Sequence, residues 1–144
     1  MDCIFCQIVA KQKNEAIVYE DAQVMAFMDR FRQPSCEGHV LVIPKTHYET
    51  FWDLSDDLCN PLMHVGQCMT RAVKNAFLCS GVRLWMANGH SAGQEVAHLH
   101  LHIFPCHSVW DRVKYLFPSL TGKRKFNDCE LEEMAAKIRH VLSV

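Results

Sequence analysis

Apolar runs rich in β-forming residues, broken by short polar stretches, predict β-strands in the first part of the chain. The runs "AIVYED", residues 16–21, and "VMAFMD", residues 24–29, are rich in β-forming residues. A short polar turn separates them, so we expect a hairpin. "GHVLVIP", residues 38–44, predicts a further strand that ends at Pro44.

A helical period replaces these runs in two other segments. We expect one helix of about five turns from near Asp56 to Leu78, because apolar residues recur there at spacings of three and four: Leu58, Leu62, Val65, Met69, Val73 and Ala76. A last helix should begin near Asn127, with Glu130 three residues on as the second half of a capping box. It should bury Leu131, Met134, Ile138 and Val141.

Two further strands, "GVRLWMA" at 81–87 and "HLHLHIF" at 98–104, complete the expected elements. Together they predict an α+β fold, an antiparallel sheet of about five strands with two main helices. The chain has 144 residues and shows no internal repeat or low-complexity tract. We therefore expect a single domain over residues 1–144.

Charge and cysteine content narrow the choice of partners. Fifteen basic residues nearly balance sixteen acidic ones, and the densest basic run, Lys123–Lys125, is too short for a nucleic-acid groove, so we interpret it as a solvated turn. No apolar run approaches the roughly 18 residues of a membrane span. The start Met1–Cys3 lacks the pattern of a secretion signal. We therefore expect a cytoplasmic protein whose eight cysteines are mostly reduced.

Three histidines, His98, His100 and His102, occupy every second position in "GQEVAHLHLHIFP", residues 93–105. In a strand all three would project from one face at intervals of about 6.8 Å, whereas in a helix His100 would point elsewhere. The preceding loop "NGHSAGQ", residues 88–94, offers backbone N–H groups to an anion. Ordinary polar contacts are the alternative, but neutral imidazoles beside such a loop indicate nucleophilic attack on phosphorus.

Two stretches of the chain resemble a known family. "NGHSAGQEVAHLHLHIFP", residues 88–105, is similar to the signature of the histidine triad (HIT) family of nucleotide hydrolases and transferases. "AFMDRFRQPSCEGHVLVIPKTHY", residues 26–48, is similar to its nucleoside-binding half. The resemblance extends from Asp2 to about Pro105 and implies a HIT-like fold.

The resemblance also implies roles for individual residues. His100 would attack the α-phosphorus of a nucleoside monophosphate conjugate and form a covalent nucleotidyl-histidine, which water then cleaves. His102 and His39 would complete the polar network around the phosphate. The other implied contacts are to the nucleotide: Asn88, Gly93 and Gln94 for the phosphate, Asp29 for the ribose hydroxyls, and Ile4, Phe5, Ile8 and Phe27 for the base.

Cys3 and Cys6 form a CxxC pair, whose spacing lets two thiolates bind one zinc ion but supplies only half of a site. The resemblance implies that His47 of "PKTHY" and His98 complete the tetrahedron. Four protein ligands leave no open position for water, so the zinc would be structural. The alternative is a pair of reduced, half-buried cysteines.

The expected activity is therefore cleavage of purine nucleoside monophosphate conjugates of the phosphoramidate type. Hydrolysis of dinucleoside polyphosphates and a non-catalytic nucleotide-binding adaptor are the alternatives. The resemblance also implies a homodimer, and we expect no nucleic-acid or membrane partner. The role of Glu95, the region from Cys106 to Phe126 and the physiological leaving group stay open.

Overall fold

The computed structural model describes residues 3–32, 37–111 and 124–143. In chain order its elements are α1 (Ile4–Val9), β1 (Ile17–Glu20), β2 (Val24–Met28), β3 (Phe31–Arg32), β4 (Val40–Pro44), η1 (Phe51–Asp53), α2 (Asp56–Ala76), β5 (Gly81–Trp85), η2 (His90–Ala92), β6 (Leu101–Cys106), β7 (Arg124–Lys125) and α4 (Asp128–Leu142). Among these residues, no helix combines the length and apolar character needed to cross a membrane.

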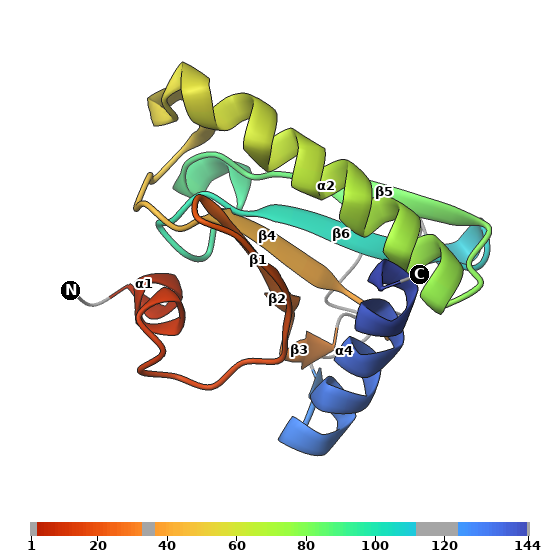
Figure 1. Ribbon diagram of the computed structural model, residues 1–144. Coiled ribbons are helices and arrows are strands. Elements are labelled where there is room, and N and C mark those ends of the chain that lie inside the picture. The colour runs from red at the N-terminus through yellow and green to blue at the C-terminus, as the bar shows by residue number, and fades with distance from the viewer. Residues whose placement is uncertain (1–2, 33–36, 112–123, 144) are drawn as a thin grey trace.

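Five strands form an antiparallel sheet in the order β1-β2-β4-β6-β5. With α2 and α4 as the two main helices, this architecture confirms the expected α+β class (Figure 1). β4 is the central strand. Its residue Leu41 lies opposite Phe27 of β2 on one side and opposite His102 of β6 on the other. His102 therefore lies on an interior strand of the sheet and not at its edge.

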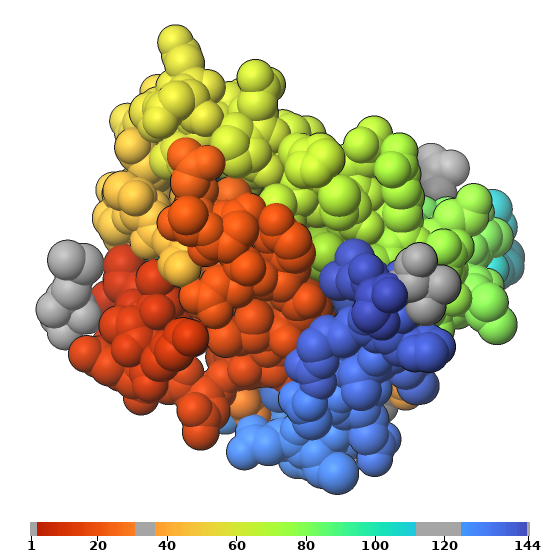
Figure 2. Space-filling model, in the orientation of Figure 1, coloured from red at the N-terminus to blue at the C-terminus, as the bar shows by residue number. Residues whose placement is uncertain are grey.

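The two faces of the sheet pack against different partners. Alternate residues such as Val24, Ala26 and Leu101 join the core formed with α2 and α4. The residues between them point to the other face and form a second apolar cluster with Phe5 and Ile8 of α1. Its sheet residues are Met25, Phe27, Leu41 and Ile43. Figure 1 shows α1 set apart from α2 and α4. Figure 2 shows the α1 segment against the β1–β2 hairpin. Every position of β2 and β4 is buried because both faces are covered.

The histidine strand begins later than the sequence pattern predicts. β6 starts at Leu101 and not at residue 98. The backbone N–H of Leu99 donates to the carbonyl of Tyr48 at 2.7 Å, and that of His98 donates to the carbonyl of Val96 at 2.8 Å. These bonds run to loop residues, so the first part of the histidine row is held outside the ladder of the sheet.

Several other boundaries differ from the expectations. The long helix ends at Ala76, because Leu78 takes a left-handed φ of 50° that ends the helical conformation before β5. The run interpreted as a solvated turn is partly a strand: Arg124–Lys125 pairs with Phe31–Arg32 as a separate two-stranded sheet, and Lys123 lies outside the described residues. Two-residue strands are too short to show a period in the sequence.

The two ends of the chain differ in how well their helices are signalled. At α4 the expected capping box is confirmed: the Asn127 side chain accepts from the Glu130 N–H, and the Glu130 carboxylate accepts from the Asn127 N–H, both at 2.9 Å. By contrast, the sequence pattern does not predict α1. It has six residues, no side-chain cap and no acidic residue in its first turn, so it lacks the usual start signals.

Candidate active site and metal centre

A pocket of about 770 Å³ lies on the α1 side of the sheet. Most of the residues expected to bind or transform a nucleotide line it: Ile4, Phe5, Ile8, Phe27, Asp29, Gly93, His100 and His102. The α1 side chains form an apolar end, and the two histidines face the same space from β6 and the segment before it. Distant parts of the chain thus converge on one cavity.

His100 is buried and held in a defined orientation. Its Nδ1 lies 2.7 Å from the carbonyl oxygen of His98, which has only acceptor sites, so Nδ1 carries the hydrogen. The ring packs edge-on against Phe5, with centroids 5.3 Å apart. Burial lowers the pKa of His100 below its ordinary value. The neutral ring therefore keeps its lone pair on Nε2, the form that a nucleophile requires.

His102 belongs to a chain of polar groups that ends at Asp29. Its Nδ1 lies 3.0 Å from Nε2 of His39, so one hydrogen lies between the two rings. His39 is fully buried, and its Nδ1 lies 2.8 Å from the Asp29 carboxylate. The carboxylate is close to the ring, but the contact does not have the geometry of a hydrogen bond. His39 reaches the pocket only through these neighbours.

The electrostatics keep the His102 ring neutral at physiological pH. Burial, and after it the neighbouring His39 and His100 rings, lower the pKa of His102 to about 2. Stacking against Phe104, with ring centroids 5.5 Å apart and planes 3° apart, holds the ring in place. A neutral imidazole donates at one nitrogen and accepts at the other. His102 can therefore pass a hydrogen bond from His39 towards the pocket.

The loop before the triad is braced by the amide side chains of Asn88 and Gln94. Oδ1 of Asn88 accepts from the Phe51 N–H at 2.6 Å. Oε1 of Gln94 accepts from the Gly89 N–H at 2.6 Å, and its Nε2 donates to two backbone carbonyls. Neither side chain lines the pocket, whereas Gly93 does, with a left-handed φ of 87° that favours glycine.

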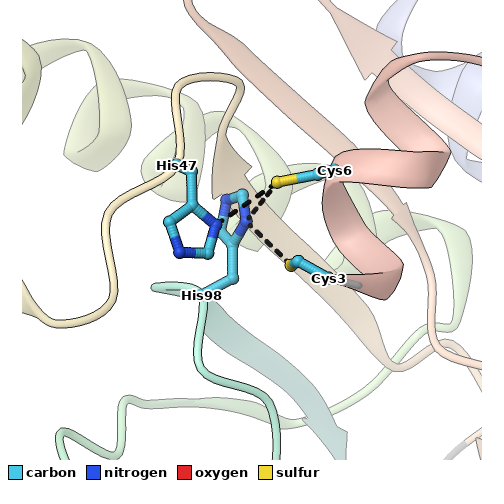
Figure 3. Close-up of side chains that lie close together, drawn as sticks. All are labelled: Cys3, Cys6, His47 and His98. Atoms are coloured by element: carbon cyan, nitrogen blue, oxygen red, sulfur yellow. Dashed lines mark hydrogen bonds between the residues drawn. The ribbon is translucent and has the colours of Figure 1, made fainter. Parts of the chain in front are cut away.

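Four side chains converge beside the apolar end of the pocket (Figure 3). Cys3 and Cys6 come from α1 and the residue before it, His47 from the loop after β4, and His98 from the segment before β6. One donor atom from each lies within 4.8 Å of every other. The Sγ atom of Cys6 lies 3.3 Å from Nδ1 of His47 and 3.6 Å from Nδ1 of His98.

These distances match the edges of a zinc tetrahedron. A sulfur at about 2.3 Å and a nitrogen at about 2.0 Å from zinc, at the tetrahedral angle, lie about 3.5 Å apart. His98 also has the outer contact that such a ligand needs, because its Nε2 lies 2.9 Å from the Pro44 carbonyl oxygen. Burial lowers the pKa of His98 to about 4, so the ring is neutral. Because its hydrogen lies on Nε2, which donates to the Pro44 carbonyl, Nδ1 is unprotonated. The donor set therefore fits zinc.

Sequence reasoning gave no role to two residues on β5. Arg83 and Trp85 line the pocket beyond His102, and the Trp85 ring centroid lies 4.7 Å from that of His102. Their alternate positions in "GVRLWMA" were the available signal, but only the pairing of β5 with β6 places them beside the triad. Glu95, whose role was open, also lines the pocket and is exposed.

Comparison with known proteins decides the family. A model of the HIT domain matches residues 10–109. The chain belongs to the HIT domain family. An uncharacterized HIT-like protein of Saccharolobus solfataricus is 44% identical over 103 residues, 72% of this chain and 73% of that protein. The adenylylsulfatase HINT3 of Arabidopsis thaliana is 31% identical over 104 residues, 72% of this chain and 52% of that protein.

Solved structures of HIT proteins agree with this fold. The crystal structure of a zinc-bound histidine triad family protein from Mycobacterium smegmatis has a TM-score of 0.80 and 29% identity, over 99% of this chain and 94% of that one. The HIT match and this likeness confirm the resemblance and the HIT-like fold expected from the sequence. They also support the zinc-binding branch, because the Cys3, Cys6, His47 and His98 cluster is present here.

Proposed function

We propose that this HIT protein cleaves purine nucleoside monophosphate conjugates, of the phosphoramidate type, through a covalent nucleotidyl-histidine on His100. One observation carries the proposal. The Nδ1–H of His100 donates to the His98 carbonyl inside the pocket, which leaves the Nε2 lone pair for attack. An adenylylsulfatase among the relatives supports hydrolysis in general.

The remaining pocket residues fit the parts of a nucleotide. The apolar end formed by Ile4, Phe5 and Phe27 suits a purine base. Asp29 lines the pocket next to this end, and an ionised carboxylate accepts hydrogen bonds from a diol. Gly93 offers open backbone to the phosphate, since a Cβ there would meet no atom within 4 Å. Asn88 and Gln94 would act indirectly, by shaping this loop.

The reaction would proceed in two displacements at phosphorus. His100 Nε2 forms a bond to phosphorus while the phosphorus–nitrogen bond to the leaving group breaks, and the departing amine takes a proton from the solvent that reaches the pocket. The neutral His39–His102 pair hydrogen-bonds the phosphate. Water then attacks the phosphorus, the bond to His100 breaks, and the proton lost by water returns to solvent. The products are nucleoside monophosphate and free amine.

Zinc would hold the scaffold of this site. Cys3, Cys6, His47 and His98 supply four protein ligands, so the ion would be structural. The cluster ties α1, which forms the apolar end of the pocket, to His98, whose carbonyl orients His100. His98 thus serves the metal centre through its ring and the catalytic histidine through its backbone.

Turnover of two substrates and binding of the nucleotide product test the proposal. A fluorogenic adenosine phosphoramidate should be hydrolysed faster than diadenosine tetraphosphate. The reverse order would favour the dinucleoside polyphosphate hydrolase. Adenosine monophosphate binding without turnover of either compound would contradict catalysis and favour the nucleotide-binding adaptor. A cytoplasmic location stays a prediction from the sequence.

We further propose a homodimer with an isologous two-fold interface. β5 is the last strand of the sheet in the described part of the chain, and an edge strand is a place where a second copy can pair. Light scattering should give twice the chain mass of 16.6 kDa. A monomer mass across micromolar concentrations would contradict it.

A further inference from the structure

The strand registers place pocket residues in rows across the sheet. Phe27 lies opposite Leu41, Leu41 opposite His102, and His102 opposite Trp85. Directly paired residues of a sheet project from the same face. This row therefore runs from the apolar end of the pocket, through the triad, to the edge strand β5.

A second feature extends this row on β5. Arg83 lies two residues before Trp85 and opposite Phe104, so its side chain shares the face of the triad. Both β5 side chains line the pocket. Arg83 is partly buried and Trp85 is 38% exposed, so the guanidinium and the indole border a region that solvent and a ligand can reach.

If the proposed function holds, the order of residues along the row indicates which part of the substrate lies next to β5. A base in the apolar end and a phosphorus atom beside His100 and His102 occupy one side of the pocket. The β5 side then lies beyond the phosphorus, where the group that leaves would lie. We propose that Arg83 and Trp85 form a leaving-group subsite that selects conjugates whose leaving group carries an anion, a carboxylate or a phosphate. The guanidinium binds the anion, and the indole provides an apolar floor.

Among the described residues, three carboxylates line the pocket and oppose this selection: Glu15, which pairs with Arg30, Asp29, which contacts His39, and Glu95. Glu95 precedes Val96, which packs against the α1 cluster. Arg83 instead lies on the outermost strand of the sheet, on the far side of His102. The two charges thus border different parts of the pocket, and a dominant Glu95 would produce the opposite preference, for cationic leaving groups.

Matched phosphoramidates test the selection. Adenosine 5′-phosphoramidates of β-alanine, β-alanine amide and 1,3-diaminopropane have leaving groups of similar length that are anionic, neutral and cationic. For the native protein, kcat/KM should be about tenfold higher for the anionic compound than for the neutral one. In Arg83→Gln that preference should fall below about twofold, whereas Arg83→Lys should retain part of it.

Arg71→Gln is the matched control, because it removes the same charge from an exposed position on α2. It should keep the tenfold preference, and loss of the preference in this variant would overturn the proposal by showing a net-charge effect. A preference for the cationic compound, or an unchanged preference in Arg83→Gln, would also overturn it. Diadenosine tetraphosphate identifies the anion: a greater loss with it than with the β-alanine conjugate in Arg83→Gln assigns phosphate, and a smaller loss assigns carboxylate.

A binding measurement separates this proposal from the proposed catalysis. In a His100→Ala background, calorimetry compares affinities for the β-alanine and β-alanine amide conjugates without turnover. Tighter binding of the acid that disappears on adding Arg83→Gln supports the subsite, even if the native protein hydrolyses neither compound. Equal affinities in the His100→Ala background would overturn the subsite and leave the proposed hydrolysis standing.

Discussion

The two faces of the central sheet use the same strands for different purposes. On the face covered by α2 and α4, Leu101 and Ile103 are buried among apolar side chains. On the opposite face, the intervening His102 and the preceding His100 border the pocket. Adjacent residues of one segment thus stabilise the fold or carry the chemistry, depending only on which side of the backbone they project from.

This division teaches why the site can hold polar rings without losing the fold. Buried imidazoles without partners would be costly, but His98, His100 and His102 each contact a carbonyl or another ring. The apolar side chains between them hold the backbone from the other face. Substitutions on the two faces should therefore separate activity from stability.

The largest effect is expected from His100→Ala on the pocket face. Loss of the nucleophile should lower turnover of the adenosine phosphoramidate at least about a thousandfold, roughly 4 kcal/mol of transition-state stabilisation. Calorimetric affinity for adenosine monophosphate and zinc content should be retained. His140→Ala, at an exposed position on α4, is the control. A His100→Ala protein within tenfold of native turnover would contradict the assignment.

Removing a zinc ligand on the pocket face should lower the stability of the protein. We expect one zinc per chain by elemental analysis, and less than about 0.2 per chain in Cys3→Ser. Where free zinc exceeds its dissociation constant about a thousandfold, the lost binding lowers stability by about 4 kcal/mol. Thermal stability should fall more than nucleotide affinity.

Cys129→Ser provides the control for the metal, since that cysteine is exposed on α4 and far in sequence from the cluster. It should bind zinc as the native protein does. Zinc-free native protein, or a Cys3→Ser protein that keeps its full zinc content, would instead favour two reduced cysteines without a metal.

On the helix face, Leu101→Ala should lower stability by about 3 kcal/mol, because a buried leucine would leave a cavity. The cavity would form next to α2, where Gly66 leaves the space that the Leu101 side chain fills. Chemical denaturation measures the change. Leu78→Ala, at a residue that is 89% exposed, should stay within about 0.5 kcal/mol. A loss of catalysis at Leu101 in protein that remains folded would break the separation of the two faces.

The sequence predicts the helix face better than the pocket face. Apolar runs of β-forming residues reveal β2 and β4, and a period of three to four residues reveals α2 and α4, because burial in the core imposes these patterns. The late start of β6 depends on a bond from Leu99 to the distant Tyr48, which no local period records. The short α1 likewise owes its place to packing with the sheet.

Convergence within the pocket depends on strand order and register. The resemblance to HIT proteins predicts that the CxxC pair, His47 and His98 form one metal site, whereas the spacing of these residues along the chain does not. The sequence does not predict a role for Arg83 and Trp85 in the pocket, because their position beside the triad follows from the pairing of β5 with β6. Pairing between strands that are distant in sequence is decided by the whole sheet.

The smallest expected effect lies at the start of α4, where Asn127→Ala removes the side chain that accepts from the Glu130 N–H. Loss of this cap should lower the free energy of unfolding by about 1 kcal/mol, and Asn127→Asp should retain most of it, because a carboxylate also accepts this bond. The position tests the separation of the faces closely, since Lys125, two residues earlier, lines the pocket. If the faces are independent, Asn127→Ala should change denaturation but leave kcat/KM for the phosphoramidate within about twofold. A larger kinetic change, with the helix content of native protein by circular dichroism, would show that the start of α4 positions the pocket rim as well as the core.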